Sequence, residues 1–325
     1  MLFRSRNKIF KKKYRLEYKE FGRNMSKLDI LFYDIATEGN TNPVVSSVLQ
    51  LFKNSKYSFP HAISMSALEK KSVVPINVSN KNNIKDYVFG KFQTKYHESK
   101  YGINKIRVVG IPRHDRNWIK TIQEYSPRLP DNFDDENTVV VLSKRASNLY
   151  FLFDNKVETL KNIKKIFIDE LGMKVAVKFH PKEKKERIYK NKEDDIYENI
   201  FGLDNYGLTW IYSGLHSFAL CKGKKLVISL GAGVIFDMIA MGAPCIEYKN
   251  KKENEEKIMQ FVKYGFVEGF SSYHELSAYV NKWKIGSNQV STTPINTCKK
   301  YFPVFNDISR VIATEILQDN EIIDR

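Results

Sequence analysis

Short runs of β-branched and apolar residues alternate with helical periodicity along most of this chain. Such runs are typical of strands buried in parallel sheets, with crossover helices between them. The sequence therefore predicts an α/β architecture. In the first half the expected strands are residues 28–34, 57–62, 86–90 and 105–110, with a helix over 43–53. In the second half the expected strands are residues 138–143, 174–180, 225–230 and 244–248, with helices over 155–172, 234–241 and 301–317.

A proline-rich and acidic stretch, YSPRLPDNFDDENT (residues 125–138), separates the two series of strands and is typical of an interdomain linker. The chain has 325 residues, more than one hydrophobic core usually serves. We therefore expect two Rossmann-like domains facing a cleft, with a ligand at the carboxyl ends of the strands.

The net charge of +16 favours an anionic partner: phosphate-rich ligands, an anionic membrane surface or nucleic acid. A general lysine bias of the chain explains the charge equally well. In residues 1–27, basic and apolar side chains are interleaved in a pattern that suits an interfacial helix on anionic lipid. The same pattern suits a basic helix packed against its own protein. The residues concerned are Leu2, Phe3, Arg4, Arg6, Lys8, Ile9, Phe10, Lys11, Lys12, Lys13, Tyr14 and Arg15.

Other composition features narrow the setting. The three cysteines show neither a disulfide framework nor metal-type pairing, which favours a reducing compartment. No apolar run approaches the roughly 20 residues that span a bilayer, and the opening stretch lacks the pattern of a secretory signal. We expect a cytoplasmic protein, and an interfacial helix over residues 1–27 would place it at the inner face of the cell membrane.

The segment KLVISLGAGVIFDMIAMGAPCIEY (residues 225–248) carries the strongest chemical signal. A buried strand leads through Ser229 into Gly231, Ala232 and Gly233, and then into a helix. Glycines let the backbone approach a ligand, and a helix amino terminus offers free N–H groups to phosphate. Asp237, one turn into this helix, is placed to reach a ribose hydroxyl. Alternatively, the turn needs small residues only for packing.

A second signal is the strand KVAVKFH, which ends in His180 and Pro181 and is followed by dense charge. An imidazole there can donate a hydrogen bond or a proton to a leaving phosphate, with Lys178 and Lys182 adding positive charge. The alternative is a surface histidine that caps a strand. The phosphate-type turn later in the same domain favours the functional interpretation.

Two motifs in the first half offer further candidates. In YSFPHAIS another predicted strand ends at a histidine, His61, which could act as a general base on an acceptor hydroxyl or be a buried histidine bonded to backbone. In VVGIPRHD, Gly110 and Pro112 form a turn that presents Arg113 and His114. Arg113 is a candidate contact for phosphate or carboxylate, although a structural turn explains the motif equally well.

The sequence contains none of the common motifs for zinc, for an activated serine or for a phosphate-binding P-loop, and no D-x-D at a strand end. The acidic pairs at residues 134–135 and 194–195 lie in loop-like, charged segments. We therefore expect no catalytic metal.

The order of these motifs resembles the GT-B glycosyltransferases and related transferases of bacterial surface polysaccharides, closest to the CDP-glycerol glycerophosphotransferase, capsule polysaccharide and sialyl- or Kdo-transferase groups. The motifs are a strand ending in His-Ala, a G-x-P-R turn, a His-Pro strand end, and a glycine turn and helix before G-x-P-x-I-x-Y. The similarity extends over residues 28–317. Relative to these enzymes the first domain is short, so the resemblance implies a GT-B-like fold with a shortened N-terminal domain.

The resemblance also implies an organisation of the chain: a basic segment over 1–27, an acceptor-side domain over 28–133, a nucleotide-donor domain over 134–300, and a helical segment over 301–325 that packs back toward the first domain. It implies His61 as the base, His180 as the group that assists the leaving phosphate, and Asp237 as the carboxylate near the donor. Nucleotide phosphate would be held at Ser229, Gly231, Ala232 and Gly233. Related enzymes have paired serines in this turn, so here backbone amides would contribute more than hydroxyls.

The leading hypothesis is a metal-independent transferase without a cofactor, which moves a sugar or a glycerophosphate-type group from a nucleotide-activated donor to a cell-surface glycan or lipid-linked glycan. The alternative enzyme is a non-hydrolysing sugar-nucleotide 2-epimerase. The competing class is a basic nucleic-acid-binding protein, but the sequence shows no zinc finger, RNP signature or basic stripe beyond the amino terminus, so we expect no nucleic-acid partner.

Overall fold

A computed structural model describes fifteen segments of the chain. They are residues 30–33, 54–60, 75–76, 78, 81–133, 136–146, 153–180, 183, 196–202, 208–212, 215–220, 225–250, 259–284, 293–303 and 307–320. The basic segment 1–27, the predicted helix over 43–53 and His61 lie outside them. The chain folds into two units, Met1–Asp115 with Tyr301–Arg325, and Arg116–Lys300.

The first unit contains a parallel four-stranded sheet in the order β1-β2-β3-β4. Short 3-10 turns precede β3 at Lys81–Asn83 and follow β4 at Pro112–His114, and the helix α4 spans Lys91–Tyr101. The strands are Ile30–Tyr33 (β1), Ser55–Ser58 (β2), Ile84–Val88 (β3) and Ile106–Val108 (β4).

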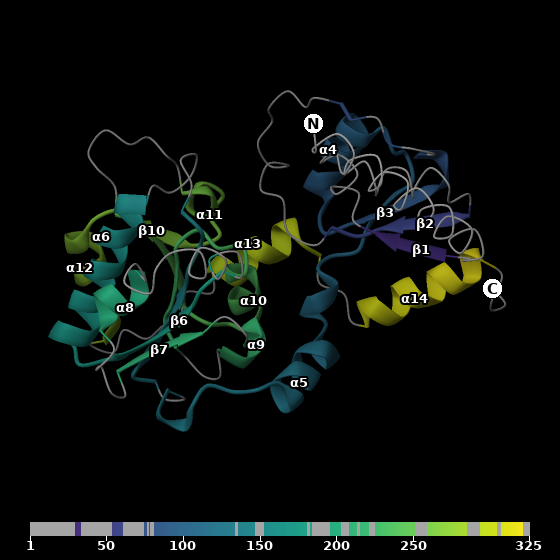
Figure 1. Cartoon of the computed structure of the whole chain (residues 1–325). Helices are drawn as coiled ribbons and strands as arrows, with labels where there is room; N and C mark the ends of the chain where they lie inside the picture. The colour runs from purple at the N-terminus through teal and green to yellow at the C-terminus, as the bar shows by residue number, and fades with distance from the viewer. Residues whose placement is uncertain are drawn as a thin grey trace, which may run out of the picture. The chain divides into compact units, whose positions relative to one another are not determined.

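The helix α14 (Ile308–Asp319) covers one face of this first sheet (Figure 1). Its isoleucines at 308, 312 and 316 recur every four residues and form one apolar stripe. That stripe packs against Tyr57, Tyr87 and Val109 of the sheet. The carboxyl-terminal helix therefore belongs to the core of the first unit.

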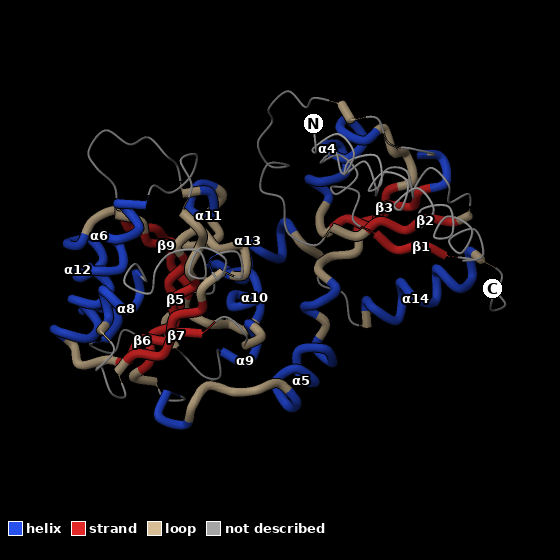
Figure 2. The backbone as a smooth tube through the Cα atoms, viewed as in Figure 1, coloured by secondary structure: helices blue, strands red, loops and turns tan. Residues whose placement is uncertain are grey.

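The second unit is built on a parallel sheet (Figure 2). This sheet has six strands in the order β10-β9-β8-β5-β6-β7. The strands are Thr138–Leu142 (β5), Lys174–Lys178 (β6), Thr209–Tyr212 (β7), Val227–Ser229 (β8), Cys245–Tyr248 (β9) and Glu268–Phe270 (β10).

Helices cover both faces of the second sheet (Figure 1). α6 (Phe153–Ile163), a π-helical segment (Lys164–Glu170), α8 (Ile196–Phe201) and α12 (Tyr273–Lys284) share a core with the alternate residues of β5, β6 and β8. α9 (Ser217–Leu220) and α10 (Ile235–Ala240) lie on the other face. The remaining elements are α5 (Arg116–Tyr125), a 3-10 turn at Asp131–Phe133, α11 (Gln260–Lys263) and α13 (Thr293–Tyr301).

The predicted α/β fold class with parallel sheets is confirmed, and each of the eight expected strands overlaps an observed one. β2 starts at Ser55 and ends at Ser58, before Pro60, because proline cannot donate to a sheet ladder. The helix expected over 301–317 was wrong in its start: α13 ends at Tyr301 and α14 begins at Ile308. Pro303 lies between them, where its ring disfavours a continuous helix.

The two units divide between Asp115 and Arg116, whereas the sequence predicted a boundary at residues 133–134. The expected linker belongs to the second unit. Leu129 and Phe133 are buried within it, and Gln123 of α5 donates a hydrogen bond to the sulfur of Met241, beyond the end of α10. Within the described residues, no helix is both long and apolar enough to cross a membrane.

Candidate functional site

The carboxyl ends of β6, β5, β8 and β9 form a continuous row in the second sheet. Leu142 is in register with both Lys178 and Ser229, and Ser229 is in register with Glu247. From β5 the chain builds the sheet in one direction through β6 and β7, and in the other through β8, β9 and β10. In open parallel sheets, ligands bind outside the carboxyl ends at such a switch point. We call this row the donor edge.

Lys178 and Asp237 are electrostatic neighbours at the donor edge. Burial lowers the pKa of Lys178, and the charge of Asp237 opposes this shift. The ammonium donates a hydrogen bond to the carbonyl of Leu215 at 2.5 Å, and Asp237 accepts one from the Ser217 hydroxyl at 2.6 Å. The structure thus brings together two predicted site residues that are far apart in sequence.

Ser229 shapes the glycine turn that follows β8. Its hydroxyl oxygen accepts hydrogen bonds from the N–H groups of Gly231, at 3.1 Å, and of Ala232, at 2.9 Å. Two of the amides that the sequence suggested for phosphate are therefore bonded inside the turn. Gly233 is exposed, with open space where a side chain would lie.

Gly231 needs to be glycine for two reasons. Its φ of +87° lies in the left-handed region, which side-chain-bearing residues rarely adopt. A Cβ atom would also lie 3.0 Å from Cε and Nζ of Lys249. The turn is therefore packed directly on a charged group, and α10, which follows it, is only six residues long.

Three charged residues at this turn were missed by the sequence reasoning: Lys144, Glu247 and Lys249. Glu247 is fully buried, and Lys249 Nζ lies 3.1 Å from its Oε1. Burial lowers the pKa of Lys144, the charge of Lys249 lowers it further, and Glu247 opposes the shift. Three lysines, including Lys178, thus face two carboxylates at the donor edge, which gives an excess of positive charge suited to a phosphate group.

His180 follows β6 at the same edge and is held by a local hydrogen-bonded turn. Its backbone N–H donates to Glu183 Oε1 at 2.8 Å, and the N–H of Glu183 donates to the carbonyl of His180 at 2.8 Å. This reciprocal pair fixes the backbone at His180, whose side chain is partly exposed. The positioning of His180 therefore depends on Glu183, a residue that the sequence reasoning did not single out.

Glu183 is itself anchored in a buried network. Its Oε2 accepts hydrogen bonds from Lys156 at 2.5 Å and from Tyr197 at 2.6 Å, with Ser143 at 3.3 Å. The Lys156 ammonium also lies 5.3 Å from the centre of the Tyr197 ring. All four side chains are nearly inaccessible to solvent. The network joins α6, β5 and α8 to the turn at His180.

Seven of the nine predicted site residues lie in the second unit, at or next to the donor edge. They are Lys178, His180, Ser229, Gly231, Ala232, Gly233 and Asp237. Arg113 lies in the first unit, in the 3-10 turn after β4, at the carboxyl end of that sheet. His61 lies outside the described residues. Across the part of the chain that the structure describes, no group of three or more His, Cys, Asp or Glu side chains could hold a metal ion.

Comparison with known proteins shows similarity in structure but not in sequence. No family model matches the chain, and no curated protein matches it. Solved structures do match. The S. aureus MnaA–UDP structure has a TM-score of 0.59 at 13% identity, covering 97% of this chain and 83% of that one. The UDP-GlcNAc 2-epimerase from Neisseria meningitidis bound to UDP-GlcNAc has a TM-score of 0.56 at 13% identity, covering 93% and 80%.

A third match is a variant of the wall teichoic acid polymerase TagF soaked with CDPG, with a TM-score of 0.50 at 13% identity, covering 84% of this chain and 71% of that one. Identities this low establish a shared fold and no more. The predicted GT-B-like fold class is confirmed. The similar structures include both an epimerase and a polymerase, so they do not select one family.

Proposed function

We propose that this protein is a metal-independent transferase that takes a nucleotide-activated donor at the donor edge and transfers its sugar, or a glycerophosphate-type group, to a glycan. The observation that carries the proposal is the positive charge along this edge of the sheet: Lys178 neighbours Asp237, Lys144 neighbours Lys249 and Glu247, and Lys249 packs against Gly231 of the glycine turn. Burial lowers the pKa values of Lys178 and Lys144, so the charged forms of both gain stabilisation when an anion arrives. A diphosphate at the end of a parallel sheet is such an anion.

Each residue has a distinct role in this proposal. Lys178 and Lys144 bind the diphosphate, and Gly233 lets the donor approach the backbone of the turn. Asp237, next to Lys178, accepts a hydrogen bond from a ribose hydroxyl after releasing Ser217. His180 donates a proton or a hydrogen bond to the phosphate as it leaves, which is the electrostatic task of such a site.

The acceptor side remains a prediction from the sequence. His61 is proposed to remove the proton from the acceptor hydroxyl as that oxygen attacks the anomeric carbon of the donor, while the bond to the nucleotide phosphate breaks. Arg113 is proposed to contact a phosphate or carboxylate group. The basic segment 1–27 is proposed to bind an anionic membrane surface that carries a lipid-linked acceptor.

A second candidate function is epimerisation at C2 of a sugar nucleotide. It is supported by the higher TM-score of the N. meningitidis UDP-GlcNAc 2-epimerase than of TagF. The two functions predict different chemistry. An epimerase breaks and remakes the C2–H bond of the donor without an acceptor, whereas a transferase leaves C2 untouched and releases nucleotide only when an acceptor is present.

Two measurements on the full chain test these functions. Calorimetry with CMP, CDP, UDP and GDP identifies the donor nucleotide, and selective binding of one of them is the expected result. NMR of the matching sugar nucleotide in D₂O then follows C2. We expect no deuterium at C2 and no C2 epimer.

Formation of the C2 epimer would replace the transferase by the epimerase. Binding of none of the four nucleotides would contradict both functions. Tight binding of an oligonucleotide that weakens steeply with salt would instead favour the nucleic-acid-binding class.

A further inference from the structure

The helix α5 carries two exposed aromatic side chains. Trp118 is 46% exposed and Tyr125 is 77% exposed. They lie seven residues apart, close to two turns of an α-helix, so both are on the same side of α5, about 10 Å apart along its axis. Neither ring packs against another aromatic ring among the described residues. Large apolar side chains grouped at the surface in this way are typical of an interaction site.

A different side of α5 anchors the helix to the second unit. Ile119, Ile122 and Gln123 are partly buried, and α5 packs against α9. Gln123 also donates a hydrogen bond to the sulfur of Met241. Because these side chains hold α5 in place, the fold itself does not explain why two large aromatic rings are kept in solvent.

Basic side chains accompany the aromatic pair. Arg116 and Lys120 lie four residues apart on α5, and Arg128 follows the end of the helix. All three are exposed, and none of their side chains forms an ion pair or hydrogen bond with a described residue. Glu124 is the one acidic residue between positions 116 and 128, which leaves an excess of positive charge. We call Arg116, Trp118, Lys120, Tyr125 and Arg128 together the α5 surface.

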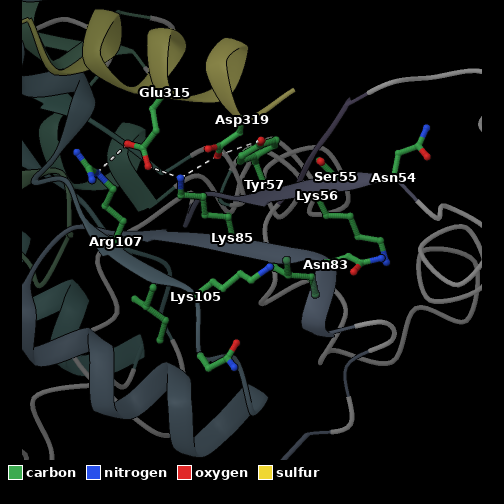
Figure 3. A pocket seen from close by; sticks show the side chains of 13 residues that line it. Asn54, Ser55, Lys56, Tyr57, Asn83, Lys85, Lys105, Arg107, Glu315 and Asp319 are labelled. Atoms are coloured by element: carbon green, nitrogen blue, oxygen red, sulfur yellow. Dashed lines mark hydrogen bonds and ion pairs between the residues drawn. The ribbon is translucent and has the colours of Figure 1, made fainter. Parts of the chain in front are cut away.

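The basic groups of the first unit are arranged differently. At a pocket of about 820 Å³, Lys85 forms ion pairs with Glu315 and Asp319, and Arg107 Nε lies 2.8 Å from Glu315 (Figure 3). These cations are already neutralised by carboxylates of α14. The cations of the α5 surface have no such partners in the part of the chain that the structure describes, so they are available to an external anion.

Exposed tryptophan and tyrosine together with unpaired cations match the surface of an anionic bilayer. Both rings favour the membrane–water interface, because each combines an apolar body with a polar group. Lysine and arginine are attracted to anionic lipids, and their long stems let the charge reach the headgroups. Single-stranded nucleic acid also binds aromatic and basic groups, but in grooves, whereas the α5 surface lies along the outside of one helix.

We propose that the α5 surface is a contact with an anionic membrane, in which the two aromatic rings enter the interface and the three basic side chains bind lipid phosphate groups. This contact is distinct from the segment 1–27. The second unit contains both α5 and the donor edge, so the contact would hold the donor-binding unit at the bilayer. It requires no nucleotide, and the inference therefore does not rest on the proposed function.

Sedimentation of the full chain with vesicles tests the proposal. Vesicles of equal parts phosphatidylglycerol and phosphatidylcholine are expected to bind the chain more tightly than phosphatidylcholine alone. Trp118→Ala changes an exposed side chain, so the fold is retained, and affinity for the anionic vesicles is expected to fall by about tenfold.

A charge reversal tests the basic side chains. Each basic side chain near an anionic surface contributes about fivefold in affinity, so Lys120→Glu is expected to weaken binding by more than tenfold. Lys95→Glu, at an exposed lysine on α4, makes the same change in net charge away from the α5 surface. This matched control is expected to bind within about twofold of the wild-type chain.

Tryptophan fluorescence distinguishes the α5 surface from the segment 1–27. That segment contains no tryptophan, and the whole chain contains three. Vesicles with brominated acyl chains are expected to quench the wild-type chain, and Trp118→Phe is expected to remove most of this quenching while the protein still binds. Quenching that is equal in both proteins, or absent while the protein binds, would assign the membrane contact to another segment and overturn the proposal.

Other outcomes would also overturn it. An absence of binding to anionic vesicles would do so, as would equal losses for Lys120→Glu and Lys95→Glu, which would indicate general charge attraction. Binding of a single-stranded oligonucleotide that is lost with Trp118→Ala, without binding to vesicles, would assign the surface to nucleic acid. A dimer that Tyr125→Ala converts to a monomer, again without binding to vesicles, would assign it to a second copy of the chain. Nucleotide binding at the donor edge is measured without lipid, so either proposal can fail while the other stands.

Discussion

Two buried Lys–Glu pairs lie at the donor edge, and they are built differently. In the Lys156–Glu183 pair, the carboxylate accepts hydrogen bonds from the ammonium, from Tyr197 and Ser143, and from the backbone of His180. In the Lys249–Glu247 pair, the charges are 3.1 Å apart, but neither oxygen of Glu247 accepts a hydrogen bond from any described residue.

The difference separates a structural pair from an electrostatic one. Buried charge is stable when its hydrogen bonds are satisfied, so the Lys156–Glu183 network stabilises the fold and fixes the turn at His180. The second pair packs against Gly231, and its lysine perturbs Lys144. The Lys249–Glu247 pair places charge next to the glycine turn, and it lowers stability because the buried carboxylate oxygens have no hydrogen-bond donor among the described residues. Such a cost is typical of functional sites.

Removing the carboxylate of each pair should give the largest difference in the free energy of unfolding. We expect Glu183→Ala to lower the free energy of unfolding by about 3–5 kcal/mol, because Lys156 loses its carboxylate and the donors of Tyr197, Ser143 and the His180 backbone lose their acceptor. Glu247→Ala should cost less, since no hydrogen bond is lost. Urea unfolding measures both, and Glu124→Ala, an exposed residue of α5, is the control within about 0.5 kcal/mol.

Glu183→Gln serves if the alanine variant does not fold, because it keeps an acceptor for the N–H of His180. An equal loss of stability for the alanine variants at positions 183 and 247 would mean that the two pairs stabilise the fold equally, which would contradict this distinction.

The glycine turn offers a matched pair of substitutions. Gly231→Ala should destabilise the protein by about 1–3 kcal/mol, because the residue has φ of +87° and its Cβ would lie 3.0 Å from Lys249. Gly233→Ala should leave stability almost unchanged, since open space surrounds it. Thermal unfolding of both variants distinguishes them, and equal melting temperatures would show that Lys249 does not support the turn.

A smaller effect is expected in proton uptake. Burial lowers the pKa values of Lys144 and Lys178 in the folded chain. At pH values below the ordinary lysine pKa of 10.5 and above these lowered values, the unfolded chain therefore binds more protons than the folded chain. The free energy of unfolding increases with pH through that window. An anionic ligand raises these pKa values, so nucleotide binding should take up protons there. Calorimetry in two buffers of different ionisation enthalpy measures the uptake, and Lys178→Met should reduce it. Proton release on binding would contradict the cationic role of this edge.

Local patterns were enough to predict most of the strands, whereas the helices α4, α5 and α12 were not predicted. Eight strands follow from their apolar runs, but β7 and β10 were missed. β10 is only three residues long, Glu268–Phe270, and contains a glycine, so it has no strand-like pattern. Pro303, which separates α13 from α14, marks a break that a helical pattern alone conceals.

The candidate site was only partly predictable, for a physical reason. Ser229, Gly231 and His180 stand out because each lies at or just after the end of a strand, and strand ends can be recognised from the local sequence. Lys178 meets Asp237, and Lys156 meets Glu183, only because the sheet order brings distant segments together. A single sequence carries no signal for such pairs, and lysine is abundant everywhere in this chain.

The donor edge of the second sheet is proposed to bind the phosphates of a nucleotide, and β6 itself provides the most direct test. Lys178 ends this strand at the donor edge, whereas Lys174 begins it at the opposite edge. Calorimetry should be repeated on Lys178→Ala and Lys174→Ala with the nucleotide that binds the wild-type chain. We predict that affinity falls by about tenfold or more for Lys178→Ala and stays unchanged for Lys174→Ala. Equal affinities for the two variants would contradict it.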